Sequence, residues 1–200
     1  MSALAITRHL LETGALPADV PVSRQGEVMW QERDLEFTAW PEARPDGSVA
    51  GAVNVADAKL GPAMDEYGRL SVRLRWAGDG PAWPDGSWLS ADEVAKLGAS
   101  FRAERDFVKD RRDLARLLSA DAEARRGDTY VWQTRASRPA RLVQSLVLTE
   151  DMGDEALAEE LRARLRRGAE VTQPGGPDEL QQARQWAKRY AKALQREIAF

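Results

Sequence analysis

Hydrophobic and polar residues alternate along three segments in the first half of the chain, at positions 35–39, 49–55 and 70–76. A period of two residues is typical of a β-strand with one buried and one exposed face. The turn between the first two segments, at 45–48, reads Pro-Asp-Gly-Ser, and proline and glycine suit the dihedral angles of a tight turn. We therefore predict an antiparallel β-meander, preceded by a short amphipathic helix over residues 4–11.

The spacing of hydrophobic residues becomes helical after residue 90. Ser90 and Glu93 form the Ser-x-x-Glu pattern of a capping box, in which each side chain accepts a hydrogen bond from the backbone N–H of the other residue. The apolar stripe that follows predicts a long helix over residues 91–118. A further strand is predicted over residues 129–134, whereas residues 142–148 fit a helix and a strand equally well.

Two more helices are predicted in the C-terminal part of the chain, one from Asp154 and one from Pro177. The Pro-Gly-Gly-Pro run at 174–177 indicates a hinge before the last helix. Together these elements predict an α+β fold, in which an N-terminal antiparallel sheet packs on a long central helix and a helical C-terminal portion follows. We expect two units, an α+β body at 1–149 and a helical extension at 150–200.

The 200 residues include no cysteine and a single histidine, His9. Thiol nucleophiles, disulfides, iron–sulfur clusters and Cys-ligated zinc are therefore excluded, as are sites that need two imidazoles of this chain. The acidic run at 150–155 is rich in oxygen ligands, but it lacks the ligand spacing of an EF-hand and also suits a helix N-terminus. We expect no metal and no cofactor.

The sequence carries neither a Walker phosphate loop, a Gly-x-Gly-x-x-Gly fingerprint nor a Gly-x-Ser-x-Gly elbow. We therefore predict a non-catalytic binding protein, and an enzyme that works through carboxylates stays open as a third possibility. No apolar run approaches the roughly 20 residues that a membrane helix needs, and the first residues do not form a signal peptide. These features predict a cytoplasmic protein without a membrane partner.

Arginine and tryptophan are the side chains that best suit a binding role. The chain has seven tryptophans and a formal net charge of −3, yet residues 101–141 carry eleven Lys and Arg against seven Asp and Glu. Arginines can hold a phosphate backbone while bases stack on neighbouring aromatic rings. We therefore predict contact with single-stranded or duplex DNA, or with RNA, through one basic and aromatic surface. Its predicted residues are Arg69, Arg73, Arg75, Trp76, Arg102, Arg105, Lys109, Arg112, Arg135, Arg138 and Arg141.

A structural interpretation of the same residues is also open. The tryptophans would then fill the core between sheet and helices, and the arginines would form ion pairs with the acids interleaved among them. On the predicted meander, Glu32, Asp34 and Glu36 are the acids that could pair with the arginines of segment 70–76.

The last predicted helix suggests a different function. Trp186, Lys188, Arg189 and Tyr190 combine aromatic and basic side chains, and two glycines precede the helix. As the alternative to nucleic-acid binding, we predict a protein-interaction or assembly subunit that binds a protein partner, or a second copy of itself, through these four residues. An amphipathic helix that packs on its own domain has the same pattern.

Overall fold

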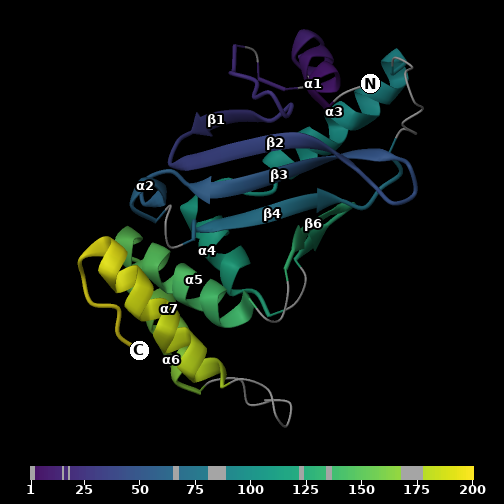
Figure 1. Ribbon diagram of the computed structural model, residues 1–200. Coiled ribbons are helices and arrows are strands. Elements are labelled where there is room, and N and C mark those ends of the chain that lie inside the picture. Colours follow the sequence, from purple (N-terminus) through teal and green to yellow (C-terminus); the bar gives the residue numbers. More distant parts are fainter. Residues whose placement is uncertain are drawn as a thin grey trace.

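The structure is a computed structural model, and it shows an α+β chain in which a six-stranded antiparallel sheet is followed by a group of helices (Figure 1). This architecture confirms the predicted fold class. The residues that the structure describes are 3–14, 16–17, 19–64, 68–80, 89–121, 124–133, 137–167 and 178–200.

The sheet has the strand order β1-β2-β3-β4-β6-β5, and every neighbouring pair is antiparallel. The strands are β1 (Val28–Glu32), β2 (Leu35–Ala43), β3 (Val49–Asp57), β4 (Ser71–Trp76), β5 (Arg125–Arg126) and β6 (Thr129–Trp132). The alternating segments predicted from the sequence correspond to β2, β3 and β4, and the predicted strand after residue 128 is β6. The strands β1 and β5 were not expected from the sequence.

The described helices number seven, and the first four of them precede or connect the strands of the sheet. Their bounds are α1 (Ala3–Glu12), α2 (Gly61–Met64), α3 (Ala91–Arg105), α4 (Arg111–Ser119), α5 (Arg138–Met152), α6 (Glu155–Arg167) and α7 (Glu179–Leu194).

One face of the sheet forms the core with the helices. Leu35 and Phe37 of β2, Val53 of β3 and Leu74 of β4 are buried, and they occupy alternate positions that point to the same face. Helices α3 and α4 contact β3 and β4 on this side, and α1 contacts β2. The alternation seen in the sequence therefore records which face of the sheet meets the helices.

The region predicted as a long helix over 91–118 is helical but contains a break. Helix α3 begins with the predicted capping box, since Ser90 accepts from the backbone N–H of Glu93 and Glu93 reaches back to that of Ser90. It ends at Arg105, and α4 begins only after Asp110, whose side chain accepts from the backbone N–H of Asp113. An N-cap aspartate satisfies a backbone donor that would otherwise lack a partner, which favours a new helix start at that point.

The C-terminal helices pack together and against the rest of the chain. Residues 142–148, which fitted both a helix and a strand, lie in the middle of α5. Helix α5 contacts α4, α6 and α7, and α7 also contacts α2. The expected division between residues 149 and 150 falls inside α5, and the predicted hinge at 174–177 lies outside the described residues.

Candidate functional site

The second face of the sheet is the surface on which the candidate residues meet. Figure 1 views the strands from this side, with α3 and α4 behind them. Arg73 and Arg75 of β4 alternate with the buried Val72 and Leu74, so their side chains project from the face opposite the core. We call this surface, on β1 to β6, the open face.

The strand register aligns the side chains of the open face in rows that cross the sheet. One row runs through Thr38 of β2, Asn54 of β3, Arg73 of β4 and Trp132 of β6. The next row runs in the same strand order through Trp40, Ala52, Arg75 and Tyr130. Directly opposed side chains in an antiparallel sheet lie close enough to touch, so the register brings two arginines next to three aromatic rings.

The two arginines of β4 lie against tryptophan rings and share one carboxylate. The Arg73 guanidinium carbon lies 4.9 Å from the ring centroid of Trp40 and 6.0 Å from that of Trp132, and the Arg75 carbon lies 5.0 Å from that of Trp132. Glu42 Oε1 accepts from Arg73 at 2.8 Å and from Arg75 at 2.9 Å. This cluster of two cations and one anion, which we call the Arg–Trp cluster, carries one net positive charge.

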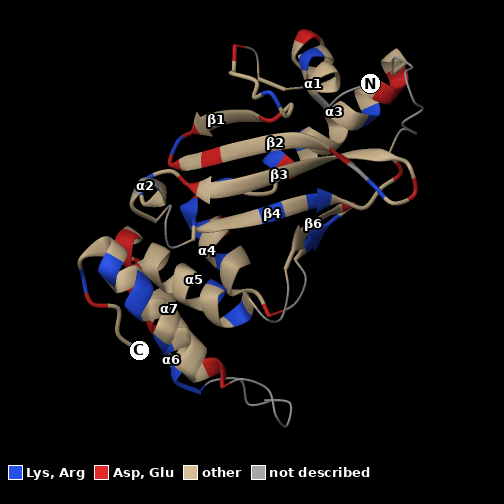
Figure 2. Ribbon diagram, in the orientation of Figure 1, with Lys and Arg blue, Asp and Glu red and all other residues tan. Residues whose placement is uncertain are grey.

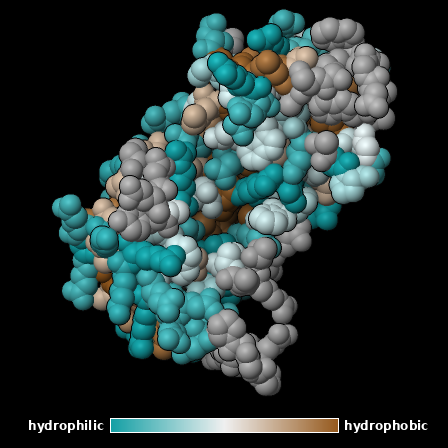
Figure 3. Space-filling view, in the orientation of Figure 1, coloured by the Kyte–Doolittle hydropathy of each residue, from teal (hydrophilic) through white to brown (hydrophobic). Residues whose placement is uncertain are grey.

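Small and apolar residues lie beside the Arg–Trp cluster. The central strand β3 turns Ala50, Ala52 and Ala56 towards the open face, where all three are buried, and the β4 arginines extend across β3 to Trp40 and Glu42 of β2. Trp132 is 46% exposed although it is large and hydrophobic. Figure 3 shows this side of the molecule as mostly hydrophilic, with a hollow near its middle that has an apolar floor. The open face thus combines accessible aromatic surface with fixed positive charge.

Arg69, just before β4, and Trp76, at the end of β4, were also predicted for the binding surface but do not belong to the Arg–Trp cluster. Arg69 is paired with Glu36, one of the three acids that the sequence analysis named as partners for these arginines. Trp76 follows Arg75 in the strand, so its side chain points to the face opposite the Arg–Trp cluster. Figure 2 shows the basic segments of β4 among acidic segments of the neighbouring strands.

The remaining predicted arginines and the predicted lysine do not join this surface. Arg102 and Arg105 lie on α3 and Lys109 on the segment after it, all on the helical side of the sheet. Arg112 pairs with Asp154 at 2.7 Å. The residues predicted to bind nucleic acid therefore do not form a single basic surface.

The arginines near the start of α5 hold helices in place. Arg138 bridges Asp121 at 2.8 Å and Glu179 at 2.7 Å. Arg141 donates to the backbone carbonyls of Leu118 and Ala120 at the C-terminal end of α4. Arg135 lies outside the described residues.

The predicted partner-binding residues of α7 are divided between core and surface. Tyr190 is fully buried, and its hydroxyl accepts a hydrogen bond of 2.8 Å from Gln144 of α5. Burial raises the pKa of Tyr190 to about 12. Trp186 is half-buried beside Tyr190, with the Arg189 guanidinium over its ring, whereas Lys188 and Arg189 are exposed. The aromatic side of α7 therefore packs mainly within this chain.

Trp40, Glu42, Tyr130 and Trp132 belong to the site, although the sequence analysis did not assign them to it. The alternation within β2 and β6 carried a usable signal for Trp40 and Trp132, because it places them opposite the buried positions of their strands. No such signal marks Glu42 as the shared partner of Arg73 and Arg75, since that depends on the pairing of three strands.

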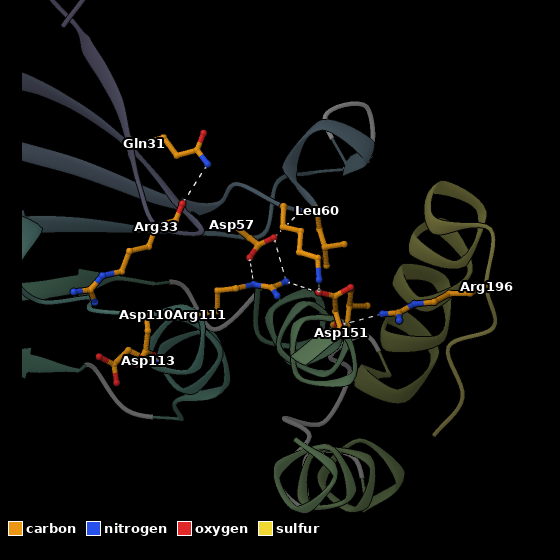
Figure 4. Close-up of polar contacts among 11 residues, drawn as sticks. Gln31, Arg33, Asp57, Leu60, Asp110, Arg111, Asp113, Asp151 and Arg196 are labelled. Atoms are coloured by element: carbon orange, nitrogen blue, oxygen red, sulfur yellow. Dashed lines mark hydrogen bonds and ion pairs between the residues drawn. The ribbon is translucent and has the colours of Figure 1, made fainter. Parts of the chain in front are cut away.

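A second cluster of charges lies inside the molecule, where β3 ends. Arg111 at the start of α4 donates to Asp57 at 2.5 Å and to Asp151 of α5 at 2.8 Å (Figure 4). Asp151 also accepts from Lys59 at 2.9 Å, and Asp57 accepts from the backbone N–H of Leu60. Partial burial alone would raise the pKa of Asp151, but the hydrogen bonds from Lys59 and Arg111 lower it below its usual value. These charges join the sheet to two helices.

Glu104 of α3 is a buried acid without a hydrogen-bond partner among the described residues. Burial, reinforced by the charge of Glu42, raises its pKa to about 9, so the carboxyl group is neutral at pH 7. It lies against Gly51 of β3, where an added Cβ would come within 2.8 Å of Glu104 Oε2 and of Ser100 Oγ. Glycine at position 51 therefore permits this close contact between strand and helix.

The described ranges show neither a cluster of metal ligands nor a membrane-spanning helix. They contain no group of three or more His, Cys, Asp or Glu side chains placed to hold a metal ion. Among the helices described, none combines the length and the apolar character needed to cross a membrane.

Comparison with known proteins gives no relative for this chain. No protein-family model, no curated protein and no solved structure matches it significantly.

Proposed function

We propose that the open face binds single-stranded nucleic acid and that the protein acts by binding rather than by catalysis. Bases would stack on the exposed ring of Trp132, and Arg73 and Arg75 would contact the phosphates. Base stacking on aromatic side chains together with a basic groove is the usual way in which single strands are held. A cytoplasmic location, where such strands occur, is part of the same proposal.

The observation that carries the proposal is the Arg–Trp cluster. Arginine guanidinium groups that lie over tryptophan rings are held flat, so they lose less freedom when they bind an anion. Glu42 accepts from both arginines but compensates only one of the two positive charges, because a carboxylate carries a single negative charge. A phosphate can therefore bind at the second positive charge without displacing the ion pair.

The shape of the surface favours a single strand over a duplex. Proteins usually read duplex DNA by placing a helix or a two-stranded ribbon in the major groove. Here the helices α3 and α4 lie behind the sheet, and the strands present a broad face with half-buried arginines. Splayed bases can lie flat on such a face, as they do on other sheet platforms.

The experiment is a fluorescence-anisotropy titration of a labelled 15-nucleotide oligothymidylate and of a 15-base-pair duplex at 50 mM salt. We expect the single strand to bind more tightly than the duplex. Loss of one stacked base costs about 1–3 kcal/mol, so Trp132→Ala should weaken binding by roughly 5- to 150-fold. The double variant Arg73→Gln/Arg75→Gln should weaken it by more than about tenfold.

The matched control is Arg102→Gln, because Arg102 is an exposed arginine on the helical side of the sheet. Its affinity should equal that of the wild type. Absence of binding by the wild-type protein, or equal losses in Arg102→Gln and Arg73→Gln/Arg75→Gln, would overturn the proposal.

The alternative role of α7 as a docking helix has less support from the contacts. Of its four predicted residues, Tyr190 is fully buried and Trp186 is half-buried against it. Only Lys188 and Arg189 are exposed, and two exposed cations do not form an apolar docking surface.

A further inference from the structure

A cavity of about 460 Å³ lies at the junction of the β1–β2 turn, the end of α3 and β5. This volume is within the roughly 300–1,000 Å³ typical of small-molecule sites. The residues that line it are Glu32, Arg33, Leu35, Phe37, Arg105, Asp106, Val108, Lys109 and Arg126. None of them belongs to the Arg–Trp cluster, so this cavity is separate from the site proposed above.

The walls of the cavity carry more positive than negative charge. Arg33 donates to the backbone carbonyl of Lys109 and Arg126 donates to that of Asp106, and neither guanidinium has a carboxylate partner among the residues that the structure describes. The Lys109 ammonium group has no ion-pair partner within the described ranges. The fourth cation, Arg105, pairs with Asp106 at 3.2 Å.

The charges of the lining leave an excess of two. The four cations Arg33, Arg105, Lys109 and Arg126 are opposed by two carboxylates, those of Glu32 and Asp106. A phosphate monoester carries about −1.5 to −2 at pH 7, which matches this excess better than a single carboxylate does. In Figure 4 the Arg33 side chain points away from the buried Asp57–Arg111 pair. Its guanidinium donates to the backbone carbonyl of Lys109, and this bond places it beside the cavity.

The floor of the cavity is apolar and partly aromatic. Leu35, Phe37 and Val108 line it, and each is held in the core with only a small part of its surface accessible. Phe37 is stacked on Trp30, with ring centroids 5.1 Å apart and ring planes 8° from parallel. This stacking fixes the Phe37 ring, and because Phe37 is only 2% exposed, the ring closes the floor of the cavity and offers no face to a ligand.

We propose that this cavity binds the phosphate group of a small phosphate compound. Arg33, Lys109 and Arg126 bind the phosphate, as arginine and lysine commonly do. This inference stands independently of nucleic-acid binding at the open face, because the two sites share no residue.

The test is isothermal titration calorimetry with three probes: adenosine 5′-monophosphate, adenosine and inorganic phosphate. Adenosine 5′-monophosphate and inorganic phosphate should both bind, each at least tenfold more tightly than adenosine, which lacks the charge. No measurable binding at millimolar adenosine 5′-monophosphate would overturn the proposal. Binding of adenosine as tight as that of adenosine 5′-monophosphate would also overturn it, since the charges of the lining would then contribute nothing.

Variants of the residues that line the cavity show whether the ligand binds there. Arg33→Gln/Lys109→Gln should weaken adenosine 5′-monophosphate binding at least tenfold, and Arg126→Gln provides a second variant on a different element. Lys96→Gln is the matched control, because Lys96 is an exposed lysine of α3 that does not line the cavity. Trp132→Ala should also bind like the wild type. If Trp132→Ala abolishes binding, or if the cavity variants bind normally, the ligand does not occupy this cavity.

Discussion

Arg111 of α4 donates from Nε to Asp57 Oδ2 of β3 at 2.5 Å, and the Asp57 side chain is completely withdrawn from solvent. The same guanidinium reaches Asp151 at the end of α5. One arginine therefore ties the end of the central strand to two helices. Because buried charges are costly unless they are paired, all three side chains must be present together.

Removing Arg111 should strongly destabilise the fold. Arg111→Met leaves Asp57 buried without its cation, and breaking a buried ion pair in this way costs about 3–5 kcal/mol of unfolding free energy. Urea denaturation at pH 7 measures the change. The control is Arg112→Met, which breaks the half-exposed pair with Asp154 and should cost about 1 kcal/mol or less. Similar losses in the two variants would contradict the assigned role of Arg111.

Glu104 should make the stability fall as the pH rises. Its pKa is about 9 in the folded protein and near 4.5 in the unfolded chain, so between these values the folded state binds the extra proton. The contribution of Glu104 is therefore complete below about pH 4.5 and is lost as the pH rises towards 9, with a slope of at most about 1.4 kcal/mol per pH unit.

The variant that checks this is Glu104→Gln, measured by urea denaturation between pH 5 and pH 8.5. The unfolding free energy of the variant minus that of the wild type should increase steadily with pH. Glu160→Gln is the control at an exposed position, and its difference should stay flat. A difference for Glu104→Gln that does not change with pH would show that the carboxyl group is ionised in the folded state.

Tyr190 should contribute to stability rather than to partner binding. Tyr190→Ala empties a fully buried site and should cost about 3–5 kcal/mol, whereas Tyr190→Phe loses only the hydrogen bond to Gln144 and should cost about 1 kcal/mol. Thermal or urea denaturation measures both, with Arg189→Ala as the exposed control. An unchanged stability of Tyr190→Ala would revive the docking role of α7.

The salt dependence of oligonucleotide binding should be weak, because few phosphates are contacted. Two phosphate contacts, one each from Arg73 and Arg75, predict a slope of log K against log salt of about −1.4 for a single strand. Anisotropy titrations from 50 to 300 mM salt give the slope. A slope several times steeper would mean that a much larger basic surface takes part.

The predictions from sequence that succeeded rest on local patterns. Alternation along β2, β3 and β4 predicted three strands and the face on which each residue lies. The Ser90–Glu93 capping box located the start of α3. The suggested pairing of Glu36 with an arginine of the third strand is confirmed for Arg69.

The features that the sequence did not reveal depend on distant pairing or on a cap inside an apolar stripe. Glu42 is 31 residues from Arg73, and only the register of three strands brings the two together. The hydrophobic stripe continues through the break after Arg105 and predicts one continuous helix. The N-cap at Asp110, which marks the start of α4, is a weaker signal than this stripe. The pairing of Arg112 with Asp154 and the bonds of Arg141 to the end of α4 could not be predicted either, because they depend on how the helices pack.

The central claim is that the open face binds a single strand, and backbone amide chemical-shift mapping tests it most directly. An oligothymidylate titrated into ¹⁵N-labelled protein should shift amides of 38–42, 73–75 and 130–132, and leave those of α3 and α7 nearly unchanged. Shifts concentrated on α3 or α7, or no shifts at an oligonucleotide concentration well above that of the protein, would contradict the account.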